Sequence, residues 1–125
     1  MKPLVYIASP YSKGDQLRNA EFQFKIMHKM MDDGIVVPFP PLFSHYAHVY
    51  RNRAYMDWVE YDNDLINRRM FDCCIRLDAI DGDYVIHESS GADAEVRLFQ
   101  SLGIPVFNSI ESLYQWAEAK DNNVT

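Results

Sequence analysis

The sequence reads Glu88-Ser89-Ser90-Gly91-Ala92-Asp93-Ala94-Glu95-Val96-Arg97 and, shortly after, Leu102-Gly103-Ile104-Pro105-Val106-Phe107. This order predicts a loop of small residues, a short helix, a glycine stop and a strand. Backbone N–H groups at such a helix start are free to bind an anion. Glu95 lies about one turn inside the helix, where the helix dipole favours the ionised carboxylate. The stretch therefore predicts an anion pocket beside a reactive carboxylate.

Strand and helix patterns alternate along the chain. Strands are expected at 4–8, 35–37, 73–77 and 104–107. Helices are expected from an Asp15 N-cap to a Gly34 C-cap, over 54–71, after Ser89, and from Asn108 or Ser109 to about 120. We expect a loop over 42–53, a hairpin turn at 81–83 and a frayed tail over 121–125. The alternation predicts one α/β domain over 1–125, a flavodoxin- or Rossmann-like three-layer sandwich with a mostly parallel sheet of four to five strands.

Composition excludes several classes of protein. The net charge of −6, with scattered Lys and Arg, argues against a nucleic-acid partner. Cys73 and Cys74 are adjacent and cannot build a disulfide framework, which indicates buried thiols in a reducing compartment. The apolar run 4–8 is too short for a signal peptide, and no membrane-length segment follows it. We therefore expect a cytoplasmic protein without membrane association.

Ligands of such folds bind at the carboxyl ends of the strands. Three segments are expected to meet there: 9–14 after the first strand, 39–43 after the second, and 89–91 before the helix that carries Glu95. The chain has no Gly-x-Gly-x-x-Gly and no Walker loop, which argues against a dinucleotide or NTPase site. His45 and His48 lack a third ligand for zinc, and the aspartates near 81 lack the closing glutamate of a calcium loop. No metal or cofactor is expected.

Glycosidic-bond chemistry requires two acidic groups, one to attack the sugar and one to transfer a proton. Glu95 is the first candidate, although acidic residues are also common on the surface near helix starts. Asp64 is the second, and its alternative is a solvated residue in the acidic run 60–64. Tyr6 is either a core tyrosine or a site residue, because a covered hydroxyl needs a partner. Ser89, with the small residues that follow it, is either an ordinary N-cap or part of an anion site.

The segments 5–11 (Val-Tyr-Ile-Ala-Ser-Pro-Tyr), 89–96 and 102–106 resemble the nucleoside 2-deoxyribosyltransferase superfamily, in order and over nearly the whole chain. That superfamily contains base-exchanging transferases and N-glycosidases of (deoxy)nucleoside 5′-monophosphates. The resemblance implies that Glu95 is the nucleophile and that Tyr6 orients it. It also implies an assisting aspartate about eight residues before an Asp that opens a strand, which Asp64 and Asp72 match, with Asp62 as the fallback. The residues around 78–86 are extra relative to the family, and the loop after the first strand has one glycine instead of several.

We therefore expect cleavage of the N-glycosidic bond of a (deoxy)nucleoside 5′-monophosphate through a covalent glycosyl-enzyme. The alternatives are a deoxyribosyltransferase and a non-catalytic nucleotide sensor. The family implies a homodimer or larger homo-oligomer. The residues expected to bind substrate are Ser9, Lys13, Ser89, Ser90 and Gly91 at the phosphate, and Phe39 and Phe43 against the base.

Overall fold

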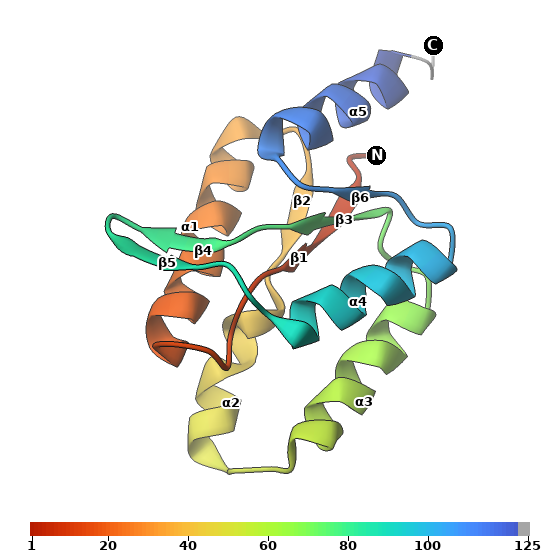
Figure 1. The fold of residues 1–125 in the computed structure, drawn as a ribbon. Coiled ribbons are helices and arrows are strands. Elements are labelled where there is room, and N and C mark those ends of the chain that lie inside the picture. The colour runs from red at the N-terminus through yellow and green to blue at the C-terminus, as the bar shows by residue number, and fades with distance from the viewer. Residues whose placement is uncertain (123–125) are drawn as a thin grey trace.

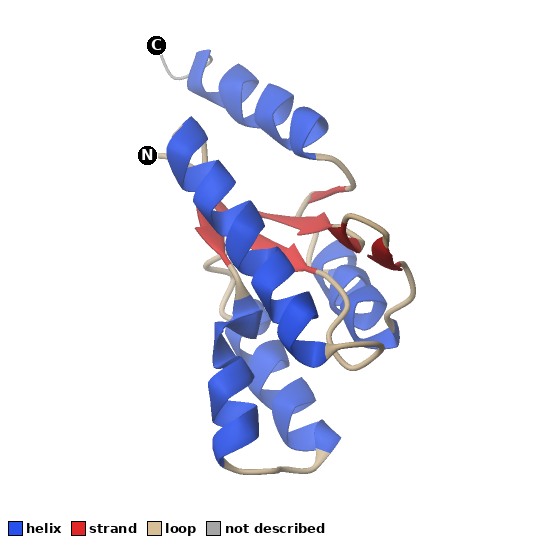
Figure 2. Ribbon diagram, turned by 90° about the vertical axis from the view of Figure 1, so that its left-hand side faces the viewer, coloured by secondary structure: helices blue, strands red, loops and turns tan. Residues whose placement is uncertain are grey.

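The computed structural model describes residues 1–122, and it is an α/β structure with a four-stranded parallel sheet between helices (Figures 1 and 2). A tail was predicted from 121, but the last helix continues to Asn122, and positions 123–125 lie outside the described residues. Within 1–122, no helix combines the length and apolarity needed to cross a membrane. In chain order the elements are β1 (Leu4–Ala8), α1 (Gln16–Asp33), β2 (Val37–Phe39), the 3₁₀ helix η1 (Pro41–Ser44), α2 (His45–Tyr50), α3 (Tyr55–Asn67), β3 (Cys73–Arg76), β4 (Ala79–Asp81), β5 (Tyr84–Ile86), α4 (Ser90–Ser101), β6 (Val106–Phe107) and α5 (Ile110–Asn122).

The main sheet has the strand order β2-β1-β3-β6, and every neighbouring pair is parallel. The chain moves outward from β1 to β2 on one side and then returns to place β3 on the other side of β1. This reversal beside β1 is the topological switch point at which ligands of doubly wound folds bind. The predicted fold class is confirmed, with four strands.

The sheet buries a different set of side chains on each face. Val5 and Ile7 of β1 pack in a core with α1 and α5, whereas Tyr6 and Ala8 pack in a second core with α3 and α4. Figure 1 shows these two pairs of helices on opposite sides of the sheet. Because successive side chains of a strand point to opposite faces, the wholly apolar run of β1 fits a strand covered twice. Tyr6 is thereby directed to the face that carries α4.

Local capping signals in the sequence are confirmed. Asp15 accepts a hydrogen bond from the Arg18 N–H at 3.1 Å and starts α1, and Gly34 ends it in the left-handed conformation with φ 71°. Ser89 caps α4 by accepting from the Ala92 N–H at 3.1 Å. Ser109 does the same before α5.

The segment 42–53 differs from the prediction, because it contains η1 and α2 instead of a loop. The one buried residue of α2 is His45, so an apolar periodicity was absent from its sequence. The second strand lies at 37–39, later than the predicted 35–37, and it includes Pro38. An edge strand tolerates that proline, because one side of its backbone needs no sheet partner. Helix α3 ends at Asn67 rather than near 71, since Arg69 adopts φ 58°.

The predicted hairpin is confirmed as the antiparallel pair β4 and β5, with its turn at Gly82. It does not extend the main sheet but packs against the start of α1 (Figure 1). The Tyr84 hydroxyl accepts from the Asp15 N–H at 2.8 Å and donates to Asn19 Oδ1 at 2.8 Å. The guanidinium of Arg18 lies 4.2 Å from the centre of the Tyr84 ring. The hairpin therefore supports the loop between β1 and α1.

Replacing Gly14 by alanine tests this support. Gly14 has φ 83°, and a Cβ there would lie 2.6 Å from the Tyr84 hydroxyl, whose hydrogen bonds oppose its displacement. Gly82 also has a positive φ, of 60°, but has no atom within 4 Å of its Cβ position, so Gly82→Ala is a matched control. We expect Gly82→Ala to lower the free energy of unfolding by about 1 kcal/mol and Gly14→Ala by about 2–3 kcal/mol, measured by urea denaturation. Equal losses would show that the hairpin does not constrain the loop.

Candidate active site

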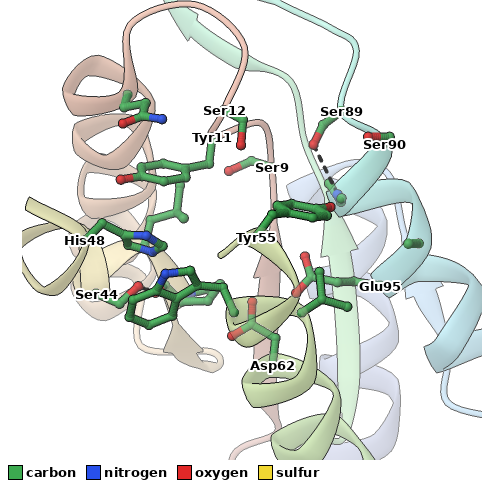
Figure 3. Close-up of a pocket in the computed structure, with 18 of the residues that line it drawn as sticks. Ser9, Tyr11, Ser12, Ser44, His48, Tyr55, Asp62, Ser89, Ser90 and Glu95 are labelled. Atoms are coloured by element: carbon green, nitrogen blue, oxygen red, sulfur yellow. Dashed lines mark hydrogen bonds between the residues drawn. The ribbon is translucent and has the colours of Figure 1, made fainter. Parts of the chain in front are cut away.

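A cavity of about 880 Å³ lies beside the carboxyl end of β1 (Figure 3). Its walls come from the loop between β1 and α1, from η1 and α2, from the first half of α3, and from the start of α4. Figure 3 shows Ser89, Ser90 and Glu95 on one side, His48 and Tyr11 on the other, and Asp62 between them. The structure thus brings together segments that the sequence analysis expected at the carboxyl edge.

Tyr6 and Glu95 form the centre of this site. The Tyr6 hydroxyl donates a hydrogen bond to Glu95 Oε2, and both residues line the cavity. The Tyr6 ring is fully buried and packs against Phe39, Phe71 and Phe99 at centroid distances of 5.9, 5.1 and 5.3 Å. This packing fixes the position of the hydroxyl. Burial, reinforced by the Glu95 charge, raises the pKa of Tyr6 well above its ordinary value, so the hydroxyl remains a donor at neutral pH.

The Glu95 carboxyl is not in the state that the helix dipole alone predicted. Burial raises its pKa to about 8, the Tyr6 hydrogen bond lowers it, and the Asp62 charge raises it further. The dipole falls off within the first turn, and Glu95 is the sixth residue of α4, so desolvation dominates. A carboxyl with a pKa near the pH of the cell can exchange protons and can act as a basic nucleophile once ionised.

Asp62, not Asp64, is the second acidic residue of the cavity. Asp62 lines the cavity, and burial raises its pKa to about 6, whereas Asp64 is exposed and lies outside the lining. The two positions are about 200° apart around α3, so they face opposite directions. This placement corrects the expectation for Asp64 and selects the fallback. The signal was available in the sequence, because Asp62 shares a helical face with the buried Ile66.

The residues expected at a phosphate gather at one end of the cavity. Ser9, Lys13, Ser89, Ser90 and Gly91 all line it. Ser9 is buried, and its hydroxyl accepts a hydrogen bond from Gln23 Nε2 of α1 at 2.8 Å, which fixes its position. The Ser89 hydroxyl already caps α4. Lys13 Nζ lies 2.5 Å from the Glu88 carboxylate, which makes Glu88 a further residue of this end.

Phe39 and Phe43 do not line the cavity, which corrects the expectation that they stack on a base. Phe39 lies in the core beside Tyr6, and Phe43 packs edge-on against Phe39 at 5.5 Å. Side chains of α2, α3 and the loop after β1 form an aromatic wall instead. In this wall the rings of His48 and Trp58 are 3.8 Å apart and those of Tyr11 and His48 are 5.0 Å apart.

The sequence did not predict this aromatic wall, because its members lie in segments whose patterns indicate packing or loop structure. Trp58 fitted helix packing, and His48 lay in a segment expected to be a loop. The Tyr11 hydroxyl is 2.8 Å from Nδ1 of the buried His45, which holds Tyr11 in place. Burial, with a smaller effect of His45, lowers the pKa of His48, so this imidazole is neutral near pH 7. A wall of neutral aromatic rings suits a heteroaromatic ligand.

The rest of the described chain adds no metal site. Within 1–122, no three His, Cys, Asp or Glu side chains are grouped to hold a metal ion. Cys73 and Cys74 are buried in β3, and burial raises both thiol pKa values. These thiols are therefore not activated nucleophiles.

Comparison of the chain with protein-family models, with curated proteins and with solved structures gave no match. The function is therefore inferred from the geometry of the cavity and from the sequence motifs that build it.

The raised pKa of Glu95 predicts a pH-dependent stability. Because the folded pKa of about 8 exceeds the ordinary 4.5, the folded state holds this proton longer than the unfolded chain, and stability is lost as pH rises from about 4.5 through 8. Glu95→Gln removes this loss. We expect the variant to be more stable than the wild type at pH 9, by on the order of 3 kcal/mol, and to differ little from it at pH 4.5. Denaturant titrations at both pH values measure the difference.

Asp64→Asn is the matched control, since Asp64 is an exposed carboxylate outside the cavity. Its effect on the free energy of unfolding is expected to stay within about 0.5 kcal/mol at either pH. A Glu95→Gln variant that gains nothing at pH 9 would contradict the burial argument.

Proposed function

We propose that the protein cleaves the N-glycosidic bond of (deoxy)nucleoside 5′-monophosphates. The observation that carries this proposal is the partly buried Glu95 carboxyl, hydrogen-bonded by Tyr6, in one cavity with the second acidic residue Asp62. Two carboxyl groups in different environments are what a double-displacement glycosidase requires. The resemblance of segments 5–11 and 89–96 to the nucleoside 2-deoxyribosyltransferase superfamily supports the same roles for Tyr6 and Glu95.

The chemistry follows from the two acids. The ionised Glu95 attacks C1′ of the sugar, and the bond from C1′ to the base nitrogen breaks with its electron pair moving to the base. This step requires Glu95 ionised and Asp62 protonated. Since the pKa values of about 8 for Glu95 and about 6 for Asp62 favour the opposite arrangement near neutrality, a small fraction of the protein carries the reacting form, and in that form Asp62 gives its proton to the departing base. Asp62 then accepts a proton from water, whose oxygen attacks C1′ and releases Glu95. Tyr6 holds the Glu95 carboxylate through its hydrogen bond during both steps.

The remaining parts of the cavity suit the rest of a nucleotide. Backbone N–H groups at the start of α4, with Ser9 and Lys13 opposite, provide donors for a 5′-phosphate. The wall of Tyr11, His48 and Trp58 provides aromatic contacts for the base. With the phosphate and the base in these positions, the sugar would lie between them, next to Glu95, which Figure 3 shows in the wall of the cavity.

A catalytic role explains the loss of folding stability caused by the site better than a sensor role does. Burying Glu95 and Asp62 raises both pKa values and destabilises the folded protein at neutral pH. A module that only binds nucleotide gains nothing from two destabilising acids beside the sugar position, whereas a glycosidase uses both. A transferase would use the same first step and a second base in place of water.

Base release from nucleoside monophosphates, followed by chromatography, tests the proposal. We expect the wild type to release base, Glu95→Gln to lose at least about 1,000-fold in kcat/KM, and Asp62→Asn to lose about 100-fold or more. Asp64→Asn, two positions from Asp62 on the opposite face of α3, should keep most of the activity. Exchange of base between deoxynucleosides without hydrolysis would favour the transferase. Saturable binding that survives Glu95→Gln, with no base release by the wild type, would favour the sensor.

We also propose that the protein forms a homodimer through the surface around α2 and the start of α3. Large apolar side chains are exposed there over a short stretch of chain, most of all Tyr50, at 92%. Contiguous exposed apolar side chains of this kind mark interaction surfaces. The others are Phe43, Tyr46, Val49, Tyr55 and Met56.

Light scattering coupled to size exclusion measures the oligomeric state. We expect the mass of a dimer for the wild type and of a monomer for Tyr50→Glu, because a charge at the centre of a buried interface is costly. Met31→Glu, at an exposed apolar residue on α1, is the control and should remain dimeric. A monomeric wild type at micromolar concentration would contradict this proposal without affecting the catalytic one.

A further inference from the structure

An ion pair spans the phosphate end of the cavity. Lys13, in the loop after β1, lies 2.5 Å from the Glu88 carboxylate, in the segment that leads from β5 into α4, and both residues line the cavity. The contact therefore joins the two loops between which a phosphate would lie. Lys13 lowers the pKa of Glu88, so the carboxylate is ionised at neutral pH.

The backbone on each side of this pair is fixed. The fully buried Asn19 donates from Nδ2 to the carbonyl of Lys13 at 2.8 Å, and its Oδ1 accepts from the Tyr84 hydroxyl. On the other side, the Arg76 guanidinium donates to the carbonyl of His87 at 2.7 Å and to Asp93 at 3.0 Å. These hydrogen bonds hold the backbone of Lys13 and the backbone next to Glu88 in place, while both side chains are exposed.

Few basic side chains line the cavity, so the Lys13–Glu88 pair has a large effect on the charge that a ligand meets there. Among residues 1–122, the lysines and arginines that line the cavity are Lys13 and Arg53. Arg53 belongs to the segment between α2 and α3, where it lies 3.8 Å from Asp57. At the α4 end, Lys13 is therefore the lining cation, and Glu88 is its partner.

We propose that the Lys13–Glu88 pair is a charge gate that limits the ligand to a single phosphate. A 5′-monophosphate replaces Glu88 as the partner of Lys13, whereas a second phosphate would bring further negative charge beside the Glu88 carboxylate, the more exposed member of the pair. This inference rests on the proposed function, because it takes the 5′-phosphate to bind at the start of α4. Glu88 is then a specificity-determining residue that weakens anion binding in order to make it selective.

A purely structural role does not explain the pair. The side chains of Lys13 and Glu88 are 62% and 81% exposed, and ion pairs at such exposure contribute little to stability. Removing Glu88 should therefore leave the melting temperature nearly unchanged. Its removal should instead increase the affinity for phosphorylated ligands, whereas removal of a residue that binds the ligand would decrease it.

Calorimetric titration at low ionic strength tests the gate. The ligands are the four 2′-deoxynucleosides, their 5′-monophosphates and their 5′-diphosphates, and all variants carry Glu95→Gln so that no ligand is consumed. We expect Glu88→Gln to strengthen diphosphate binding about three- to fivefold and monophosphate binding less, with no change for nucleosides. Lys13→Gln should weaken monophosphate binding about two- to fivefold, and both effects should shrink as salt is added. Glu118→Gln, an exposed change of the same charge on α5, should leave the ratio of the affinities unchanged.

The outcomes separate the gate from the proposed function. A Glu88→Gln variant that keeps the wild-type ratio of diphosphate to monophosphate affinity, or binds all three ligands more weakly, overturns the gate. A shifted ratio without base release by the wild type supports the gate and refutes the glycosidase. Base release by the wild type with equal kcat/KM for monophosphates and diphosphates overturns the gate and leaves the glycosidase standing.

Discussion

The hydrogen bond from Tyr6 to Glu95 joins two residues that are 89 positions apart in sequence, and the arrangement of the site depends on it. Tyr6 belongs to β1, at the centre of the sheet, and Glu95 belongs to α4, which packs on that face of the sheet. The aromatic side chains of Phe71, in the segment between α3 and β3, and of Phe99, in α4, hold the Tyr6 ring in place. One core cluster therefore packs the helix and at the same time orients the acidic residue. The position of Glu95 follows from packing rather than from a mobile loop.

The same burial makes the site costly for the fold. A carboxyl group that is removed from water without gaining a cationic partner retains its proton. The hydrogen bond from Tyr6 replaces only part of the stabilisation that water gave to the Glu95 carboxylate. Asp62 adds a second carboxyl in the same cavity, and its charge opposes the ionisation of Glu95. The two groups therefore titrate as a pair, and the first proton released disfavours release of the second. Such coupling separates an acid from a base within one small cavity, which is the condition for proton transfer in both directions.

Local chemistry made most of the fold predictable from the sequence. The apolar run of β1, the Asp15 and Ser89 caps and the glycine at 82 each specify a conformation through nearby atoms alone. The predictions that failed depended on neighbours distant in sequence. Phe39 is apolar and is the last residue of β2, but whether it faces a ligand or Tyr6 is decided by how α3 and α4 cover the sheet. The aromatic wall likewise exists because α2 brings His48 against Trp58, and α2 has no apolar stripe that would predict it.

The hairpin of β4 and β5 supports the site without lining it. Neither β4 nor β5 lines the cavity, yet Tyr84 fixes the loop after β1 through Asp15 and Asn19, and the strand β5 leads into Glu88 and Ser89. The segment therefore connects the two loops that face each other across the phosphate end. In folds of this class a glycine-rich loop adapts its backbone to an anion. Here the corresponding loop has Gly14 alone, and it is held by side-chain hydrogen bonds from Asn19 to the carbonyls of Tyr11 and Lys13. Rigidity imposed from the hairpin replaces flexibility in the loop, and a rigid loop can select its ligand by charge because it cannot move away from an unfavourable one.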